Sequence, residues 1–115
     1  TEAEWEKAAR SSGNQELTKN KANYDSNSTK SAGSYSANDS GFYDMAGNAS
    51  EWCSTSESLE DGLDVSWPEK YILKGGSWKN NDPYFLSPFV GEEYNPDCGT
   101  GSYSYEGFRL CISAD

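Results

Sequence analysis

Two carboxylates lie seven residues apart in the stretch GFYDMAGNASEWC, which runs from Gly41 to Cys53. Asp44 and Glu51 flank a Gly-Asn turn, and anionic side chains that face one loop repel each other unless a positive charge lies between them. Calcium binds carboxylate, amide and backbone carbonyl oxygens, and Gly47 would let the backbone turn so that carbonyls point inward. The residue types therefore allow a calcium site, although on these types alone an ordinary acidic surface turn is the more common interpretation.

The composition predicts one folded domain with an unusual core. The length of 115 residues suits one domain or most of one. Only 14 residues are Leu, Ile, Val or Phe, but 4 Trp and 8 Tyr add aromatic surface, and each large ring can bury about 150–250 Å². We expect a loop-rich fold with aromatic clusters, in which a metal or a partner contributes a large share of the stability.

The net charge limits the partners. The chain has 19 acidic and 9 basic residues, for a formal charge of -10. Such a field repels phosphate backbones and anionic lipids, so we expect no nucleic-acid partner and no membrane-surface role. No apolar window is long enough to span a membrane. The charge favours bound cations, basic partners or neutral ligands.

The three cysteines have no metal-binding spacing. Cys53, Cys98 and Cys111 allow at most one disulfide, and buried or incidental thiols are the simpler interpretation. The chain has no histidine, so the usual general base near neutral pH is missing. It begins directly in a predicted helix, which suggests a piece of a longer protein, so the missing signal peptide says nothing about export.

Local patterns predict one helix and a few short strands. In TEAEWEKAAR, Thr1 and Glu4 form a capping box, and Trp5, Ala8 and Ala9 share the docking face. Residues 11–40 are a long polar loop region that would need an organising centre to be ordered.

The predicted strands lie in the second half of the chain. YILKGGSW (Tyr71–Trp78) indicates a strand that a glycine pair ends, and GFRLCIS (Gly107–Ser113) indicates a strand with alternating apolar residues. Arg109 of the second strand either pairs with an acid such as Glu51 or is solvated.

Four blocks carry a family resemblance. TEAEWEKAAR, GFYDMAGNASEWC, ILKGGSW and GFRL, in this order and spacing, resemble the formylglycine-generating enzyme family, also called the sulfatase-modifying factor domain. The resemblance implies an α+β, C-type-lectin-like fold over residues 1–115 that is partial at its N-terminus. It would have one or two helices, short antiparallel strands and much irregular chain.

The resemblance also implies calcium ligands. In the family, calcium lies on the second block, so the matching ligands here are the Asp44 and Glu51 side chains and the Gly47 and Ala49 carbonyls. A second, more loosely matching family site corresponds to Asn23, the Tyr24 carbonyl and Asp25.

The copper-binding cysteines of the family's catalytic centre are replaced in this chain. Formylglycine synthesis uses copper held by two cysteines after the GGS block, and soft Cu(I) requires sulfur. Asn80 and Phe85 occupy those two positions. Ser77 matches a family active-site serine, but Ser50 replaces a tryptophan of the substrate groove. We therefore expect no copper and no formylglycine synthesis.

The segment Lys79–Glu106 is the predicted binding surface. Its aromatic residues lie among Asn, Ser, Gly and Asp, a composition typical of binding surfaces, although several rings must contribute to the core. We expect a non-catalytic domain that binds a protein or a glycan outside the cytoplasm, since relatives are often exported in bacteria. The predicted ligand-binding residues are Tyr84, Phe85, Tyr94, Tyr103 and Tyr105.

Three other functions stay open at this point. A variable protein of a diversity-generating retroelement would have this fold, with its mutated segment between GGSW and GFRL. A copper-dependent protein-modifying oxidase, or a degenerate relative of one, would act on a protein cysteine. A structural role within a larger exported protein is the third.

Overall fold

The computed structural model describes residues 1–10, 16–57, 70–94 and 103–111. Cys98 and the end of the predicted second strand, beyond Cys111, lie outside these residues. Within them, no helix has the length and apolar character that a bilayer-crossing segment requires. The elements are α1 (Glu2–Ala9), β1 (Ser50–Glu57), β2 (Lys70–Lys74), the 3₁₀ helix η2 (Pro83–Leu86), β3 (Gly91–Tyr94) and β4 (Glu106–Gly107).

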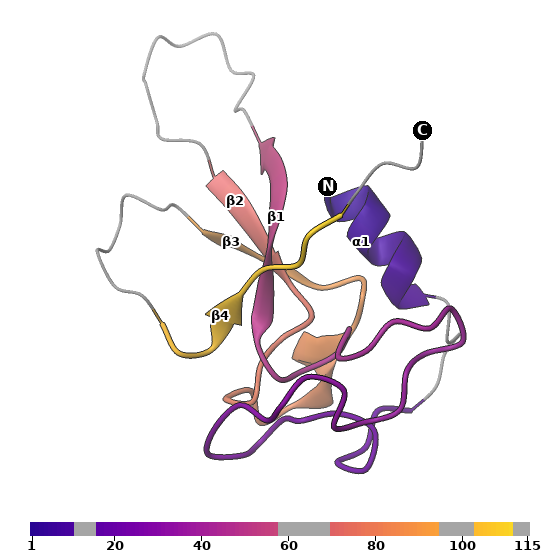
Figure 1. Ribbon diagram of the computed structural model, residues 1–115. Helices are drawn as coiled ribbons and strands as arrows, with labels where there is room; N and C mark the ends of the chain where they lie inside the picture. The colour runs from indigo at the N-terminus through magenta and orange to yellow at the C-terminus, as the bar shows by residue number, and fades with distance from the viewer. Residues whose placement is uncertain (11–15, 58–69, 95–102, 112–115) are drawn as a thin grey trace, which may run out of the picture.

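A small mixed sheet forms the centre of the fold (Figure 1). Its strand order is β3-β2-β1-β4, with antiparallel pairing of β1 with β2 and of β2 with β3. The sheet is not purely antiparallel as predicted, because β4 pairs in parallel with the start of β1. A parallel partner requires a long crossover, and the chain between β1 and β4 contains the other two strands.

Helix α1 has the predicted start and the predicted docking face. The Thr1 hydroxyl accepts from the Glu4 backbone N–H at 3.3 Å, and the Glu4 carboxylate binds the Thr1 amino group at 2.9 Å. Trp5 is buried against Met45 and Cys53. Ala8 and Ala9 pack beside this cluster, so the helix covers the sheet through one aromatic side chain.

A buried lysine fixes the other side of α1. Lys74, at the end of β2, is 1% exposed, and its ammonium lies 3.0 Å from a Glu6 oxygen and 3.4 Å from a Glu2 oxygen. The ammonium also lies 5.8 Å from the Trp5 ring centroid. Two acidic residues on one face of the helix, Glu2 and Glu6, therefore neutralise a charge that burial would otherwise make costly.

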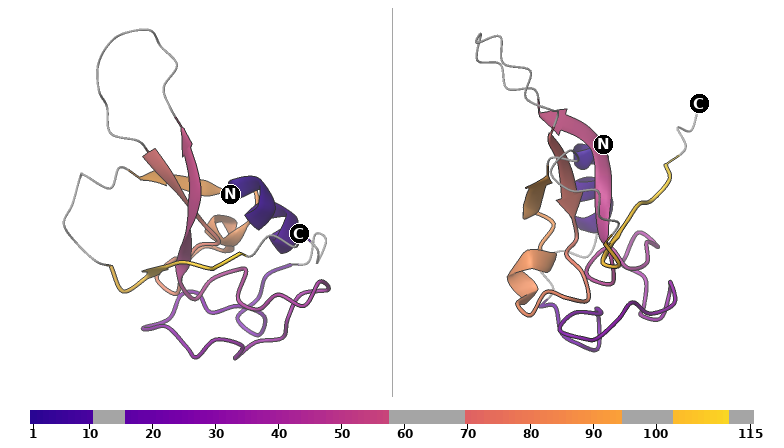
Figure 2. Two further views of the ribbon diagram at one scale, coloured as in Figure 1. Left: turned by 45° about the horizontal axis from the view of Figure 1, so that its top comes forward. Right: turned by 90° about the vertical axis from the view of Figure 1, so that its left-hand side faces the viewer.

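Irregular chain occupies the lower end of the molecule in Figures 1 and 2, beside η2. Its organising centre is Asn48, whose left-handed backbone turns the chain at a φ of 67°. The Asn48 side-chain oxygen accepts from the Lys30 N–H at 2.8 Å and from the Asn23 amide at 3.0 Å. Its amide nitrogen donates to the Lys30 carbonyl at 3.1 Å. One side chain thus holds three separate turns together.

The strand predicted for Gly107–Ser113 is wrong in extent. Strand β4 covers only Glu106–Gly107, and Phe108 and Leu110 are exposed. The Arg109 side chain between them binds Tyr43 and Glu51 of the second block. Strand β1 was not predicted, although β2 ends at the glycine pair as expected.

Candidate functional site

Asp44 and Glu51 line one pocket of about 280 Å³, together with Asn48, Ala49 and Arg109. The two acids come from the chain segment that enters β1, so the pocket lies at the start of that strand. Three of the four residues expected at the first calcium site are therefore brought together. Gly47 is not among the residues that line this pocket.

The positive group beside these acids is a guanidinium. Arg109 binds the Glu51 carboxylate through Nη2 at 2.7 Å and through Nε at 3.0 Å. Its Nη2 also donates to the Tyr43 carbonyl at 2.8 Å. The hydrogen bond to Glu51 raises the pKa of Arg109, as does the charge of Asp44 to a smaller extent. The pairing of Arg109 with Glu51 is confirmed, and a solvated arginine is excluded.

Glu51 also forms a hydrogen bond with helix α1. The Trp5 indole N–H donates to Glu51 Oε2 at 2.7 Å, in a buried hydrogen bond. One carboxylate thereby joins α1, β1 and the chain after β4. A buried carboxylate with several strong donors is costly to lose, because its partners are left without acceptors.

Asp44 is held by a different contact. It has a left-handed backbone with a φ of 53°, and its Oδ2 accepts from the Gly33 N–H at 2.7 Å. Asp44 therefore joins the 31–34 turn to the loop before β1, while its carboxylate lies on the pocket wall.

Gly47 occupies a position that only glycine fits. Its φ is +74°, and its N–H donates to the Gly75 carbonyl at 2.7 Å. A Cβ atom here would overlap the carbonyl group of Asn23, with which Gly47 forms a parallel bridge. The Gly-Asn turn therefore joins the loop to the glycine pair that follows β2.

The residues of the second expected calcium site have other partners. Buried Asn23 accepts from the Ser26 hydroxyl at 2.6 Å and donates to the Ser28 carbonyl at 3.0 Å. Asp25 pairs with Lys19 at 2.5 Å, and the Lys19 ammonium lies 6.0 Å from the Tyr24 ring centroid.

The oxygens of the first site suit calcium in type. Among the residues that the structure describes, no three acidic or cysteine side chains gather closely enough to hold a metal by themselves. A calcium ion at the first site would therefore depend on backbone carbonyls as well as on Asp44 and Glu51. It would also share the Glu51 carboxylate with Arg109.

The two positions that match the family's copper-binding cysteines are Asn80, which lies in a turn, and Phe85, which lies on the surface. The Asn80 side-chain oxygen accepts from the Ser77 N–H at 2.7 Å and from the Ser77 hydroxyl at 3.2 Å. Ser77 is buried, so this side chain closes the turn after the glycine pair. Phe85 lies in η2 and packs edge-on against Tyr84, with ring centroids 5.5 Å apart.

The described cysteines are free thiols. Cys53 lies in the core, and burial raises its thiol pKa, which lowers the fraction of reactive thiolate. Cys111 is exposed. Ser50, at the position of the family tryptophan, is buried, and its N–H donates to the Tyr105 carbonyl at 2.8 Å.

Several of the predicted ligand-binding rings lie on the surface. Tyr84 is 64% exposed and Phe85 is 37% exposed. Phe89 of the same segment, which was not among the predicted ligand-binding residues, is 64% exposed. Tyr103 is exposed and stacks on Tyr105, with ring centroids 5.2 Å apart. Tyr94 pairs with Tyr71 in the ladder of β3 and β2, and its side chain lies outside the described part.

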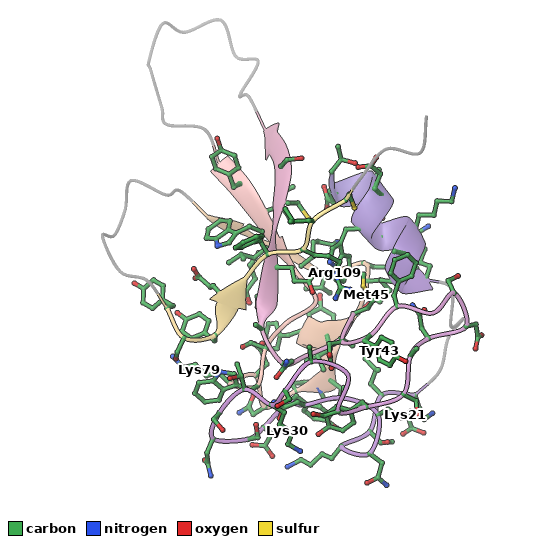
Figure 3. All side chains as sticks on the ribbon, viewed as in Figure 1. Lys21, Lys30, Tyr43, Met45, Lys79 and Arg109 are labelled. Carbon is green, nitrogen blue, oxygen red and sulfur yellow. The ribbon has the colours of Figure 1, made fainter. Side chains whose placement is uncertain are left out.

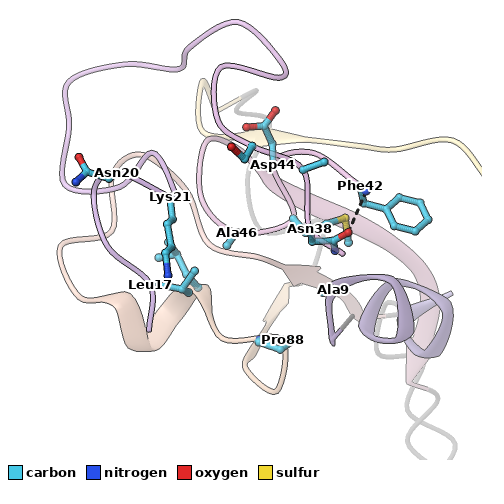
Figure 4. Close-up of a pocket in the computed structure, with 13 residues that line it drawn as sticks. Ala9, Leu17, Asn20, Lys21, Asn38, Phe42, Asp44, Ala46 and Pro88 are labelled. Atoms are coloured by element: carbon cyan, nitrogen blue, oxygen red, sulfur yellow. Dashed lines mark hydrogen bonds between the residues drawn. The ribbon is translucent and has the colours of Figure 1, made fainter. Parts of the chain in front are cut away.

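A second pocket was not anticipated from the sequence. It has a volume of about 300 Å³ and lies between the end of α1, the loop before β1 and the chain after η2 (Figure 4). Its walls are mainly apolar, with Leu17, Phe42, Met45 and Leu86, and Asp44 lines it as well. Together with Ala9 at the end of α1, these residues come from four separate segments, and no local pattern brings them together.

The fold and the site define a mixed α+β domain in which loops around the start of β1 hold the polar groups. The model of the sulfatase-modifying factor enzyme 1-like domain matches residues 1–114. The chain belongs to this family.

Solved structures share the fold. Treponema denticola variable protein 1 is similar with a TM-score of 0.72 and 29% identity, over 94% of this chain and 44% of that one. PvdO from Pseudomonas aeruginosa has a TM-score of 0.72 and 24% identity, over 94% of this chain and 49% of that one. The latter likeness is one of fold alone.

Curated relatives are much longer than the matching part. The serine/threonine-protein kinase Pkn1 of Chlamydia trachomatis is 37% identical over 97 residues, which are 70% of this chain and 16% of that protein. The chaperone protein LppX of Paenibacillus barcinonensis is 42% identical over 52 residues, 45% of this chain and 18% of that protein. The chain thus spans less than a fifth of these two relatives.

Proposed function

We propose that this domain is a non-catalytic binding domain of its family and recognises a protein or a glycan through the Lys79–Glu106 segment. The observation that carries the proposal is the exposure of Tyr84, Phe85 and Phe89 around η2. Large rings with high exposure mark interaction sites, because they offer contact area at a small entropic cost. The role of Asn80 in closing a turn supports a binding function over copper chemistry.

A substitution series tests the binding surface. The triple variant Tyr84→Ser, Phe85→Ser and Phe89→Ser should lose at least about tenfold in affinity for ligands found on glycan and peptide arrays, because truncation of central aromatic contacts costs about 2 kcal/mol or more. Tyr35→Ser removes a ring that Lys30 covers elsewhere, and it should leave affinity unchanged. Equal binding by the triple variant and the parent would contradict the proposal.

The calcium site belongs to the same proposal. Asp44, Glu51 and the Gly47 and Ala49 carbonyls would hold the ion, and Asn23 with the Tyr24 carbonyl would contribute to a second one. A bound dication would offset the repulsion between the two carboxylates. It would also add to the stability that the small hydrophobic core provides. The shared pocket of Asp44, Ala49 and Glu51 supports this assignment.

Removal of calcium should lower the melting temperature by several degrees. Stabilisation by a ligand grows with its free concentration over its Kd and amounts to about 2.7 kcal/mol at a hundredfold excess. Melting curves in 2 mM calcium, roughly a saturating level for extracellular sites, and in chelator give the shift. Asp44→Ala should abolish the difference, whereas Asp39→Ala, on an exposed turn, should keep it. An unchanged melting temperature of the parent in chelator would refute the calcium site.

A second candidate function is a variable ligand-binding protein. The similarity to Treponema denticola variable protein 1, whose structure covers 94% of this chain, favours it. Genomic sequence decides the matter: a near-identical template repeat of the Lys79–Glu106 coding region beside a reverse transcriptase gene would establish this function. Their absence from the locus would remove it.

We also propose an extracytoplasmic location, since calcium sites fill more readily outside cells. Fractionation of the source cells, with detection of the native protein by antibody, tests this. Recovery in the cytoplasmic fraction would contradict it.

A further inference from the structure

The exposed rings around η2 lie in a segment of uniform charge. Asn80–Glu106 contains five acidic residues, no lysine and no arginine. Asp82 caps η2 by accepting from the Tyr84 N–H at 2.9 Å, and it is exposed. We call Asp82, Tyr84, Phe85 and Phe89 the acidic aromatic surface.

Lysine and arginine side chains of this protein lie over several of its own aromatic rings. Among the described side chains, five basic groups lie over rings, at 4.4–6.0 Å from the centroids. A cation within about 6 Å of a ring face is attracted by the ring quadrupole. The pairs are Arg10 with Phe89, Lys19 with Tyr24, Lys30 with Tyr35, Lys74 with Trp5, and Lys79 with Tyr105; Lys30 and Lys79 are labelled in Figure 3.

One of these pairs lies on the acidic aromatic surface. The Arg10 guanidinium stacks 4.4 Å from the Phe89 centroid while it binds Glu6 at 3.1 Å. A ring face and a carboxylate together therefore hold a guanidinium here. The Tyr84 and Phe85 rings next to Asp82 present the same two chemical groups, and within the described residues no basic side chain of the chain covers them.

We propose that the acidic aromatic surface binds a basic polypeptide segment, with arginine or lysine side chains over Tyr84 and Phe85 and their charges near Asp82. This inference rests on the proposed binding function and names its partner class. The charge of -10 attracts such a segment at long range, whereas a neutral glycan would make no use of it. The local acids would repel an acidic partner.

The test uses the full 115-residue chain and two fluorescein-labelled peptides, Gly-Arg-Gly-Arg-Gly-Arg-Gly and its glutamate counterpart. Fluorescence anisotropy at low and at physiological salt gives the Kd of each. The arginine peptide should bind saturably, and its Kd should rise by about threefold or more with salt because the attraction is screened. Saturable binding of the glutamate peptide with equal affinity, or no saturable binding of the arginine peptide, would overturn the inference.

Two sets of variants locate the contact. Tyr84→Leu and Phe85→Leu keep apolar bulk but remove the ring faces, so together they should weaken binding of the arginine peptide by about fivefold, which is the effect of about 1 kcal/mol. Asp82→Asn can still cap η2 and should weaken binding, whereas Asp39→Asn makes the same charge change on another exposed turn, outside the acidic aromatic surface, and should not. Equal losses from Asp82→Asn and Asp39→Asn would show non-specific attraction and overturn the proposed contact.

Failure of the basic-partner inference can be distinguished from failure of the proposed binding function. If array ligands bind through the rings but are neutral or acidic, the serine variants lose affinity while the arginine peptide does not bind. That result would overturn the basic partner and leave the binding function standing.

Discussion

Gly47→Ala should destabilise the domain more than an alanine substitution at any other glycine that the structure describes. The added Cβ would overlap the Asn23 carbonyl group, whose carbon would lie 3.0 Å away, and the backbone φ of +74° disfavours any L side chain. The conformational term alone is about 1–2 kcal/mol, and the overlap with fixed backbone adds to it. We expect a loss of about 3 kcal/mol or more, which is a large fraction of the roughly 5–15 kcal/mol by which an ordinary domain is stable.

The backbone at position 47 cannot move to relieve this overlap without breaking hydrogen bonds. The N–H of Gly47 donates to the Gly75 carbonyl, and the N–H of Asn48 donates to the Asn23 carbonyl at 2.8 Å. A shift large enough to admit the methyl group would break these bonds and disturb the Asn48 side chain that holds the 30–48 loop. Urea unfolding followed by tryptophan fluorescence would measure the change in free energy.

Gly41→Ala is the matched control for this substitution. Gly41 has a similar φ of +84°, but nothing lies within 4 Å of its Cβ position. It should cost only the conformational term of about 1–2 kcal/mol. Equal losses from the two variants would show that the approach to Asn23 is not what stabilises the Gly-Asn turn.

The parts of the fold that were predicted correctly depend on neighbours in sequence. The capping box of Thr1 and the docking face of Trp5 follow from spacings of three and four residues, and the end of β2 follows from two adjacent glycines. Strand β1 has only a weak signal, because SEWCSTSE is rich in serine and glutamate, and Trp52 and Thr55 are its only aromatic and β-branched residues. Its pairing with β2 and the burial of Cys53 decide its conformation.

The candidate site was predicted in its residue types but not in its contacts. Asp44 and Glu51 do share a pocket, yet the Trp5 indole that binds Glu51 comes from 46 residues away and Arg109 from 58. Asn48 was missed as an organising residue because its partners Asn23 and Lys30 are 25 and 18 residues distant. No local spacing carries such information; the residue types offered Glu51 as a ligand, and the family resemblance favoured a site over an acidic surface turn.

Glu51→Ala should cost about 3 kcal/mol and weaken the attachment of both α1 and the chain after β4. Removal of one partner from a buried ion pair costs about 3–5 kcal/mol, and the lower end applies because the Arg109 side chain keeps 29% exposure against 11% for Glu51. The Trp5 indole also loses its acceptor. Measurement in chelator separates this loss from any contribution of calcium, and Lys19→Gln at the exposed Lys19–Asp25 pair should cost less than about 1 kcal/mol.

A double-mutant cycle shows whether the guanidinium itself stabilises the site. Arg109→Gln should destabilise as well, since it leaves Glu51 with the Trp5 N–H but without its compensating charge. If the two groups act as a pair, Glu51→Ala combined with Arg109→Gln should cost about 1–3 kcal/mol less than the sum of the single variants. Additive losses would mean that Arg109 stabilises the domain through the Tyr43 carbonyl, and that a different positive group, such as a bound cation, compensates the Glu51 carboxylate.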